Sequence, residues 1–156
     1  MAIAGRLKGY LDSRGICYEL VHHEYSATSL KRARAAGIPQ GRIAKSVLLE
    51  DEHGYLLVLL PASCRLEIGQ IRARLHRELE LATEQELAAL FEDCAFGAVP
   101  AIGPAYGVQT LIDDSLLRMP DLYFESGDHE DLVHLSGMAF RALLAGAPHE
   151  RCRRPH

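Results

Sequence analysis

The stretch Ile43-AKSVLLEDEHGYLLVL-Leu60 contains two apolar runs separated by the polar turn segment 51–54. Two short apolar runs joined by such a turn predict a β-hairpin. The second run, Tyr55 to Leu60, is apolar at every position, which is typical of a strand covered on both faces. The hairpin therefore predicts the centre of a sheet, with residues 55–60 as an inner strand.

Lys45 is the residue of this hairpin that departs from the apolar pattern. Side chains alternate between the two faces of a strand, so Lys45 shares its face with Ile43, Val47 and Leu49. Burying an ammonium group costs free energy unless a partner compensates for the lost water. Lys45 either extends past Ile43 into solvent or points into a cleft, where it binds an anion or stabilises developing charge. The second interpretation makes Lys45 the leading candidate for a functional residue.

Helix and strand patterns alternate along the rest of the chain without an internal repeat or a linker. The predicted helices cover residues 3–14, 26–36 (capped by Ser26 or Thr28), 66–75, 83–91 (opened by the capping box Thr83 to Glu86) and 136–145. Further strands are predicted at residues 16–22, 79–81, 107–113, 121–125 and 131–135. This order predicts one α/β (mixed α+β) domain over residues 1–147, with a mixed, largely antiparallel central sheet flanked by helices. Residues 148–156 are expected to form a mobile basic tail.

Composition limits the classes of function. The 156 residues are 48% hydrophobic and 24% charged, which indicates one globular domain. A net charge of −4 argues against broad non-specific binding of nucleic acid, although a small basic pocket remains compatible with it. The longest apolar run is too short to span a bilayer and no signal peptide begins the chain, so a cytoplasmic protein without a membrane partner is expected. The four widely spaced cysteines are expected to be reduced thiols.

The chain lacks the motifs of phosphate-binding loops, dinucleotide-binding folds, zinc proteases and serine hydrolases. Its eight histidines have no closely spaced metal-ligating partners, so neither a metal nor another cofactor is expected. His134, in a predicted strand, is either a hydrogen-bonded core histidine or a catalytic one. Ser126-Gly127 forms either a tight turn or the backbone wall of a pocket, and Asp113 either begins a turn or faces a cleft.

Several short motifs occur together in a defined order: Ala44-Lys45-Ser46 before an apolar run, Gly97-Ala-Val-Pro100, residues 108–113, Tyr123-Phe-Glu-Ser126-Gly127, and His134 before the last helix. In this order and spacing they resemble the YbaK/ProX family of aminoacyl-tRNA deacylases, which is related to the editing domain of bacterial prolyl-tRNA synthetases. The resemblance extends from about His22 to Leu144. It implies the fold of that editing domain and hydrolysis, without a metal, of the ester that joins a wrong amino acid to tRNA.

The resemblance also implies roles for individual residues. Lys45 would contact the terminal adenosine or its phosphate, backbone N–H groups near Gly97 would hold the oxyanion, and His134 would line the amino-acid pocket. The remaining residues of the implied substrate site are Ser46, Ala98, Pro100, Asp113, Ser126 and Gly127, with His23 and Tyr25 near its mouth. Water would be the attacking group, which fits the lack of a side-chain nucleophile motif.

One part of the implied site differs from the family. Many relatives have Gly-x-x-Pro-Pro-Phe-Gly, whereas Pro100 is followed here by Ala101 and Ile102. The glycine and the first proline are kept, so the backbone role is still expected. The two changed side chains alter the shape of the pocket and leave the identity of the amino acid open.

The predicted function is therefore that of a trans-editing deacylase, which removes a small amino acid such as alanine, serine or cysteine from mischarged tRNA. It is expected to act as a monomer or weak dimer, with aminoacyl-tRNA and an aminoacyl-tRNA synthetase as candidate partners. One alternative is a non-catalytic module of the same fold that binds tRNA or a synthetase. Another is an enzyme in which Lys45 forms a Schiff base with a carbonyl substrate.

Overall fold

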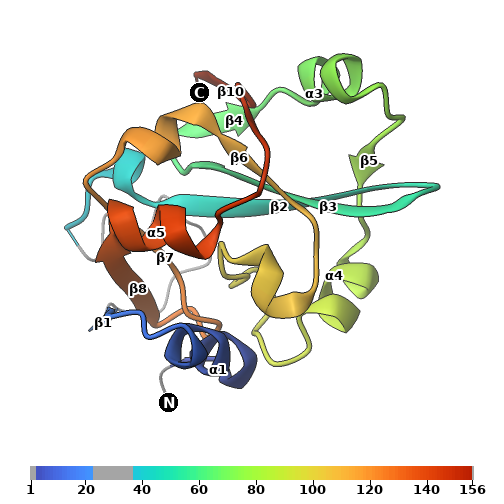
Figure 1. The fold of residues 1–156 in the computed structure, drawn as a ribbon. Coiled ribbons are helices and arrows are strands. Elements are labelled where there is room, and N and C mark those ends of the chain that lie inside the picture. Colours follow the sequence, from blue (N-terminus) through green and yellow to red (C-terminus); the bar gives the residue numbers. More distant parts are fainter. Residues whose placement is uncertain (1–2, 23–36, 156) are drawn as a thin grey trace.

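The computed structural model describes residues 3–22 and 37–155 (Figure 1). The helices in this part are α1 (Gly5–Ser13), α3 (Ile68–Leu75), α4 (Glu84–Leu90), α5 (Gly137–Leu143) and the 3-10 turns η1 (Gln40–Arg42), η2 (Gly103–Tyr106) and η3 (Asp114–Arg118). The strands are β1 (Glu19–His22), β2 (Ala44–Asp51), β3 (Gly54–Pro61), β4 (Cys64–Leu66), β5 (Glu80–Leu81), β6 (Thr110–Asp113), β7 (Asp121–Glu125), β8 (Asp131–Ser136), β9 (His149–Glu150) and β10 (Arg153–Pro155). The helix predicted at residues 26–36 lies outside the described residues.

The predicted hairpin is the centre of the fold. β2 and β3 pair antiparallel from Ala44↔Pro61 to Asp51↔Gly54, and the main sheet has the order β5-β2-β3-β6-β9. β3 pairs with β6 in parallel on its other side, so it is an inner strand, as its uniformly apolar sequence predicts. Residues 56–61 of β3 are all buried.

Two smaller sheets complete the architecture. β1, β8 and β7 form an antiparallel sheet, which a bridge between Ile43 and Tyr123 connects to the start of β2. β4 and β10 form a two-stranded antiparallel ribbon. The predicted single mixed α/β domain, with a largely antiparallel sheet flanked by helices, is thus confirmed.

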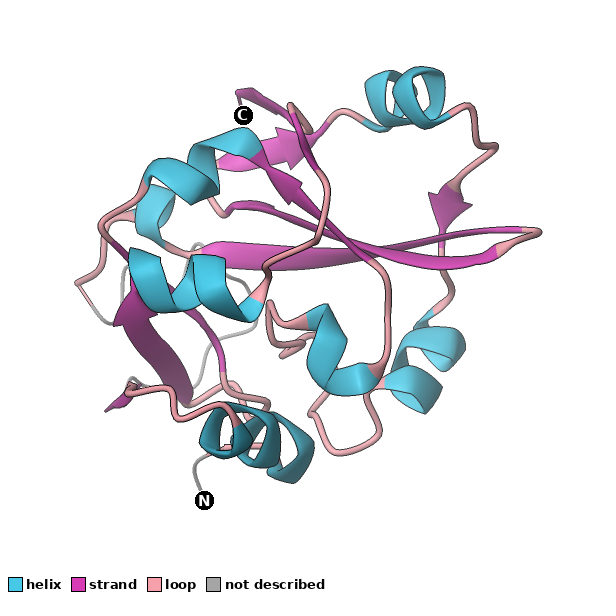
Figure 2. Ribbon diagram, viewed as in Figure 1, coloured by secondary structure: helices cyan, strands magenta, loops and turns pink. Residues whose placement is uncertain are grey.

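Alternation along β2 and β3 gives the main sheet two buried faces. Leu48, Leu57 and Leu59 face the larger core, which also contains Phe124 and Phe140. Leu49 and Val58 face a second core, which is built with Ile71 of α3 and Cys152 of the C-terminal segment; all of its central members are buried. Figure 2 shows the corresponding layers, with α1, α4, η2 and α5 below the β2–β3 hairpin and α3, β4 and β10 above it. In the described residues no helix is long and apolar enough to cross a membrane.

Helix ends follow the local signals in the sequence. Thr83 and Glu86 form the predicted capping box, in which the Thr83 hydroxyl accepts the Glu86 amide and the Glu86 carboxylate accepts the Thr83 amide. Ser136 caps α5 by accepting the Ala139 amide.

The C-terminal segment requires a correction. The sequence predicts a mobile tail at residues 148–156, but in its described part β9 pairs with β6 and β10 pairs with β4. Cys152, between these two strands, is fully buried. The segment is held by strands β6 and β4. Both lie far away in the sequence, so a local pattern could not indicate the pairing.

Candidate functional site

The candidate site lies along the outer edge of β2. Ile43 bridges to Tyr123, and pairing with β5 begins only at Leu49, with the Ala82 amide bonded to the Leu48 carbonyl. Between these points, in the part of the chain that the structure describes, no strand pairs with residues 44–47 on the side away from β3. A strand edge that stays open next to loops can accept a ligand through its backbone and adjacent side chains.

Lys45 is half-buried on one side of this edge. Its Nζ donates a hydrogen bond to the backbone carbonyl of Cys64, at the start of β4. Loss of hydration on burial lowers the pKa of the Lys45 ammonium, and the nearby Arg65 charge acts in the same direction, while Cys64 opposes it. An ammonium has three N–H donors, so two remain for an anion after the bond to Cys64. Of the three residues predicted on the face of Lys45, Val47 and Leu49 lie at the second core, whereas Ile43 lies in a separate cluster with Ala62 and Leu132.

The Ser46 side chain points to the face of β2 opposite that of Lys45. Its hydroxyl donates to the carbonyl of Pro100 at 3.2 Å, which ties the segment 96–100 to the strand. A hollow of about 210 Å³ opens beside Ser46, and Phe96, 65% exposed, stands at its rim. The rest of its lining comes from β2, the end of β5 and the start of α4: Val47, Leu48, Leu81, Ala82, Thr83, Glu84 and Leu87. The hollow is small and mostly apolar, which suits a short aliphatic group.

Gly97 is exposed at the turn of the loop and has a φ of +78°. A Cβ at this position would lie 3.3 Å from Cε1 of His129, whose Nε2 donates a hydrogen bond to the Phe96 carbonyl. His129 is buried and itself has a φ of +66°. It fixes the loop, and sequence reasoning missed this role because a left-handed histidine has no sequence signature. The Ala98 amide donates to the Ala95 carbonyl at 3.0 Å, so Ala98 serves to close the turn.

We expect Gly97→Ala to lower the free energy of unfolding by about 1–2 kcal/mol, because it combines a disfavoured φ with the His129 contact. Gly107→Ala is the matched control, since Gly107 has a φ of +68° and open space where the added methyl group would lie. Denaturant unfolding of both variants measures the difference. Equal destabilisation of the two would contradict a specific Gly97–His129 contact.

Ser126 and Gly127 follow β7 and contact the segment that leads into the Gly97 loop. The Ser126 hydroxyl donates to Asp128 at 3.0 Å, and the Ser126 carbonyl accepts the amide of Ala4. Gly127 accepts the Ala95 amide at 2.6 Å, and a Cβ on it would come within 2.9 Å of Cβ of Ala4. Both residues are buried, so they connect the loop to the start of α1. Of the two interpretations of the sequence, these contacts favour the tight turn.

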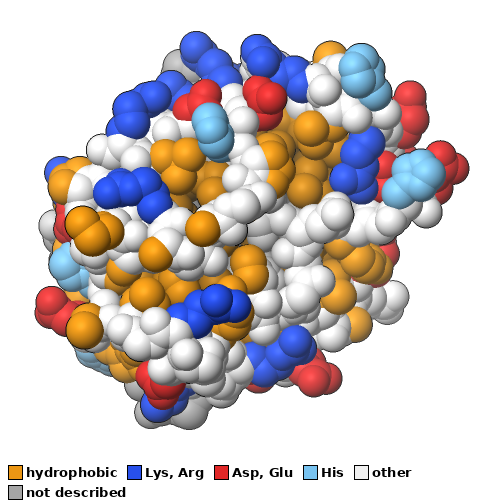
Figure 3. All heavy atoms as spheres, viewed as in Figure 1, with side chains coloured by type: hydrophobic (Ala, Val, Ile, Leu, Met, Phe, Trp, Pro, Cys, Tyr) orange, Lys and Arg blue, Asp and Glu red, His pale blue; other side chains and the backbone are white. Residues whose placement is uncertain are grey.

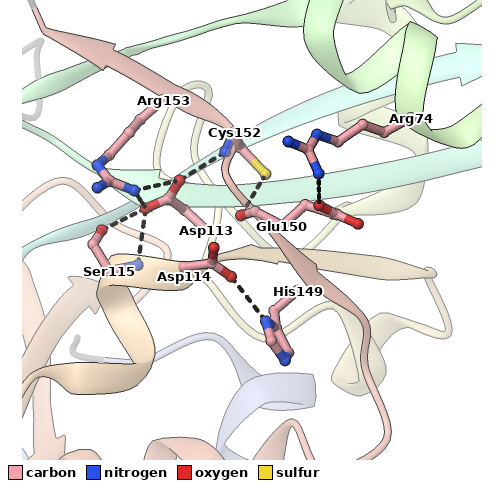
Figure 4. Close-up of polar contacts among 8 residues, drawn as sticks. All are labelled: Arg74, Asp113, Asp114, Ser115, His149, Glu150, Cys152 and Arg153. Atoms are coloured by element: carbon pink, nitrogen blue, oxygen red, sulfur yellow. Dashed lines mark hydrogen bonds and ion pairs between the residues drawn. The ribbon is translucent and has the colours of Figure 1, made fainter.

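Asp113 is fully buried at the end of β6, which β3 separates from β2. Figure 4 shows its contacts. It accepts the Ser115 amide at 3.1 Å together with the Ser115 hydroxyl, and so caps η3. It also accepts the Cys152 amide at 2.8 Å and pairs with Arg153 at 3.0 Å. Its oxygens are occupied by these donors, so the structure gives it a role in anchoring the C-terminal segment.

His134 lies on β8 in different surroundings. Its Nε2 donates to Asp121 at 2.8 Å, its ring stacks on Tyr123 with the centroids 4.2 Å apart, and Glu19 approaches Nδ1 at 3.9 Å. Arg42 donates to the other oxygen of Asp121. A separate cavity of about 340 Å³ lies beside this group, between β8 and residues 17–19 and 120–121.

The structure thus brings together Ser46, Pro100 and the turn at Gly97, with Lys45 across the same strand edge. It places Asp113 and His134 in other networks, and His23 and Tyr25 lie outside the described residues. Within residues 3–22 and 37–155, no group of three His, Cys, Asp or Glu side chains is arranged to hold a metal ion.

The fold is a mixed α/β domain, with a half-buried lysine and a glycine-led loop at the open part of the β2 edge. The sequence profile of the aminoacyl-tRNA editing domain matches residues 23–143. The chain therefore belongs to the aminoacyl-tRNA editing domain family, and the YbaK-type family expected from the sequence is confirmed.

Solved structures agree with this assignment. A protein described as a candidate trans-editing enzyme for prolyl tRNA synthetase is 28% identical, with a TM-score of 0.82 over 97% of this chain and 96% of that one. A scaffold protein used for computational epitope grafting is 25% identical, with a TM-score of 0.83 over 98% and 97% of the two chains. The hypothetical protein APE2540, 21% identical with a TM-score of 0.83 over 96% and 99%, shares the fold. No curated protein matches the chain at a comparable level of significance.

Proposed function

We propose that this protein hydrolyses the ester bond of mischarged aminoacyl-tRNA. The observation that carries the proposal is the arrangement of the β2 edge, with an ammonium group on one side and a small hollow beside a glycine-led loop on the other. An aminoacylated 3′ end has a matching layout, since its phosphate is anionic and its aminoacyl group is small and carries the reacting carbonyl. The family and the likeness to a candidate trans-editing enzyme support this assignment.

In this proposal Lys45 binds the terminal phosphate or adenosine and fixes the ester across the strand edge. The aminoacyl side chain enters the hollow beside Ser46, and the ester carbonyl approaches the backbone at Gly97, where no side chain blocks it. Water adds to the carbonyl carbon and the bond to the ribose oxygen breaks. That oxygen takes a proton and becomes the ribose hydroxyl, so the products are a free amino acid and uncharged tRNA.

The lining of the hollow is compatible with a small amino acid as the substrate. Val47, Leu48 and Leu87 give it apolar walls, which favour an uncharged side chain. Synthetases separate small or isosteric amino acids poorly, so these are the errors that a second hydrolytic step has to correct. Alanine, serine and cysteine are therefore the proposed targets.

The test is a panel of tRNAs charged with alanine, serine, cysteine and, as a bulky control, phenylalanine. We expect the protein to deacylate at least one of the three small esters faster than buffer does and to leave the phenylalanyl ester at the buffer rate. If every rate equals that of buffer while the protein still binds tRNA, the non-catalytic binding module is the better account. Efficient hydrolysis of the phenylalanyl ester would contradict the role given to the hollow.

A further inference from the structure

The C-terminal segment, which the proposed catalytic role does not use, forms a basic ribbon with β4. β10 pairs antiparallel with β4, so that Arg154 lies opposite Arg65 and Arg153 opposite Leu66. The two strands carry Arg65, Arg153 and Arg154 and contain no acidic residue. Figure 1 shows both strands above the β2–β3 hairpin, and Figure 3 shows several Lys and Arg side chains along the same upper rim, with acidic side chains among them.

The ribbon is held in a fixed position on the domain. The Cys152 amide donates to Asp113 at 2.8 Å (Figure 4). The Cys152 carbonyl accepts the Glu67 amide at 2.8 Å. Arg153 pairs with the fully buried Asp113 carboxylate, which leaves Arg154 on the exposed side of the strand. Because both the amide and the carbonyl of Cys152 are hydrogen-bonded, Arg153 and Arg154 are held against β4 and do not extend freely from the domain.

The ribbon is continuous with the candidate site. Nζ of Lys45 is bonded to the carbonyl of Cys64, the first residue of β4, and Arg65 follows directly. The Arg65 charge is close enough to contribute to the lowered pKa of Lys45. Oε2 of Glu67 lies 3.6 Å from Nη1 of Arg154, and both side chains are substantially exposed. Such an exposed ion pair stabilises the fold little, so a phosphate can replace the Glu67 carboxylate as the partner of Arg154.

We propose that the β4–β10 ribbon, through Arg65 and Arg154, binds backbone phosphates of the tRNA acceptor stem. This inference rests on the proposed function, because it takes Lys45 as the position of the 3′ end. The guanidinium group matches a phosphate with two parallel hydrogen bonds, and phosphates are the feature common to all tRNA stems. In a chain of net charge −4, a local basic ribbon next to the site confines nucleic-acid binding to one place.

The test compares the double variant Arg65→Gln/Arg154→Gln with the control Arg14→Gln/Arg118→Gln, which removes two exposed arginines elsewhere. Two substrates are used: a mischarged full-length tRNA and an aminoacylated CCA trinucleotide, which lacks the stem. With tRNA we expect the ribbon variant to lose about tenfold in kcat/KM and roughly 1.5 units of the slope of log affinity against log salt. With the trinucleotide the loss should be much smaller, and the control should resemble the wild type with both substrates.

Direct binding of uncharged tRNA separates the possible failures. If the wild type hydrolyses neither substrate but the ribbon variant alone loses tRNA affinity, the hydrolase proposal fails and the ribbon stands. If the ribbon variant and the control bind and cleave tRNA equally well, the ribbon proposal is overturned whatever the wild-type activity. An equal loss with tRNA and trinucleotide would also overturn it, because the stem would then make no contribution.

Discussion

Lys45→Ala is expected to reduce kcat for the preferred mischarged tRNA by about 10²-fold, because an ester that is no longer anchored through its phosphate or adenosine is misplaced relative to the Gly97 loop. The physical reason is the position of the ammonium. It is half-buried, bonded to the Cys64 carbonyl and located at the open edge of β2, so no other described cation takes the same place when it is removed. Single-turnover deacylation with saturating enzyme measures the effect on the chemical step.

Two further variants at the same position identify the role of the charge. Lys45→Arg keeps a cation, although with a different shape, and should retain part of the activity; Lys45→Met keeps the volume without the charge and should resemble alanine. Because methionine fills the same half-buried volume, Lys45→Met opens no cavity and should unfold at a temperature close to that of the wild type. Normal hydrolysis by both Lys45→Ala and Lys45→Met would remove Lys45 from the site.

The Schiff-base alternative gives the opposite result for arginine. The lowered pKa of Lys45 makes a neutral amine more accessible than at an exposed lysine, so this alternative requires its own control. A nucleophilic lysine should be trapped by borohydride in the presence of a carbonyl substrate, and Lys45→Arg should then be inactive. An anchoring cation should give no trapped adduct with the ester substrate.

The centre of the fold could be predicted because its signals are local. The apolar run of β3, the polar turn that joins it to β2 and the Thr83 capping box each lie within one short stretch of sequence, and the structure contains all three. The same reasoning gave the face of Lys45 correctly. It could not identify Cys64 as the partner, because the strand that supplies this carbonyl, β4, has only three residues and pairs only with β10 in the described part of the chain.

The remaining candidate residues depended on contacts between distant segments. Asp113 has the residue type of a binding-site carboxylate, but its donors include Cys152 and Arg153, 39 and 40 residues further along the chain. The sequence Ser126-Gly127 is equally compatible with a tight turn and with the backbone wall of a pocket, and only the contacts to Ala4 and Ala95 distinguish the two. His129 holds the Gly97 loop through a left-handed backbone that residue type alone does not indicate.

Asp113→Ala is expected to lower the free energy of unfolding by about 3–5 kcal/mol, the usual cost of removing one partner of a buried ion pair. The carboxylate is fully buried and receives the Cys152 amide, the Ser115 amide and the Arg153 guanidinium. Its loss leaves these donors without an acceptor and removes the cap of η3. Asp114→Ala is the matched control, because Asp114 is partly exposed and pairs with the exposed His149; it should cost less than about 1 kcal/mol.

A double-mutant cycle separates the ion pair from the other contacts of Asp113. Arg153→Met removes the charge that Asp113→Ala leaves uncompensated, so the double variant should be less destabilised than the sum of the two single variants. Urea unfolding of the four proteins gives the coupling free energy. Additive effects would show that Asp113 stabilises the fold through its other donors, the Ser115 hydroxyl and the amides of Ser115 and Cys152. A coupling of about 1 kcal/mol or more would instead make the Asp113–Arg153 pair the contact that holds β10 on β4, and with it the arginines of the ribbon.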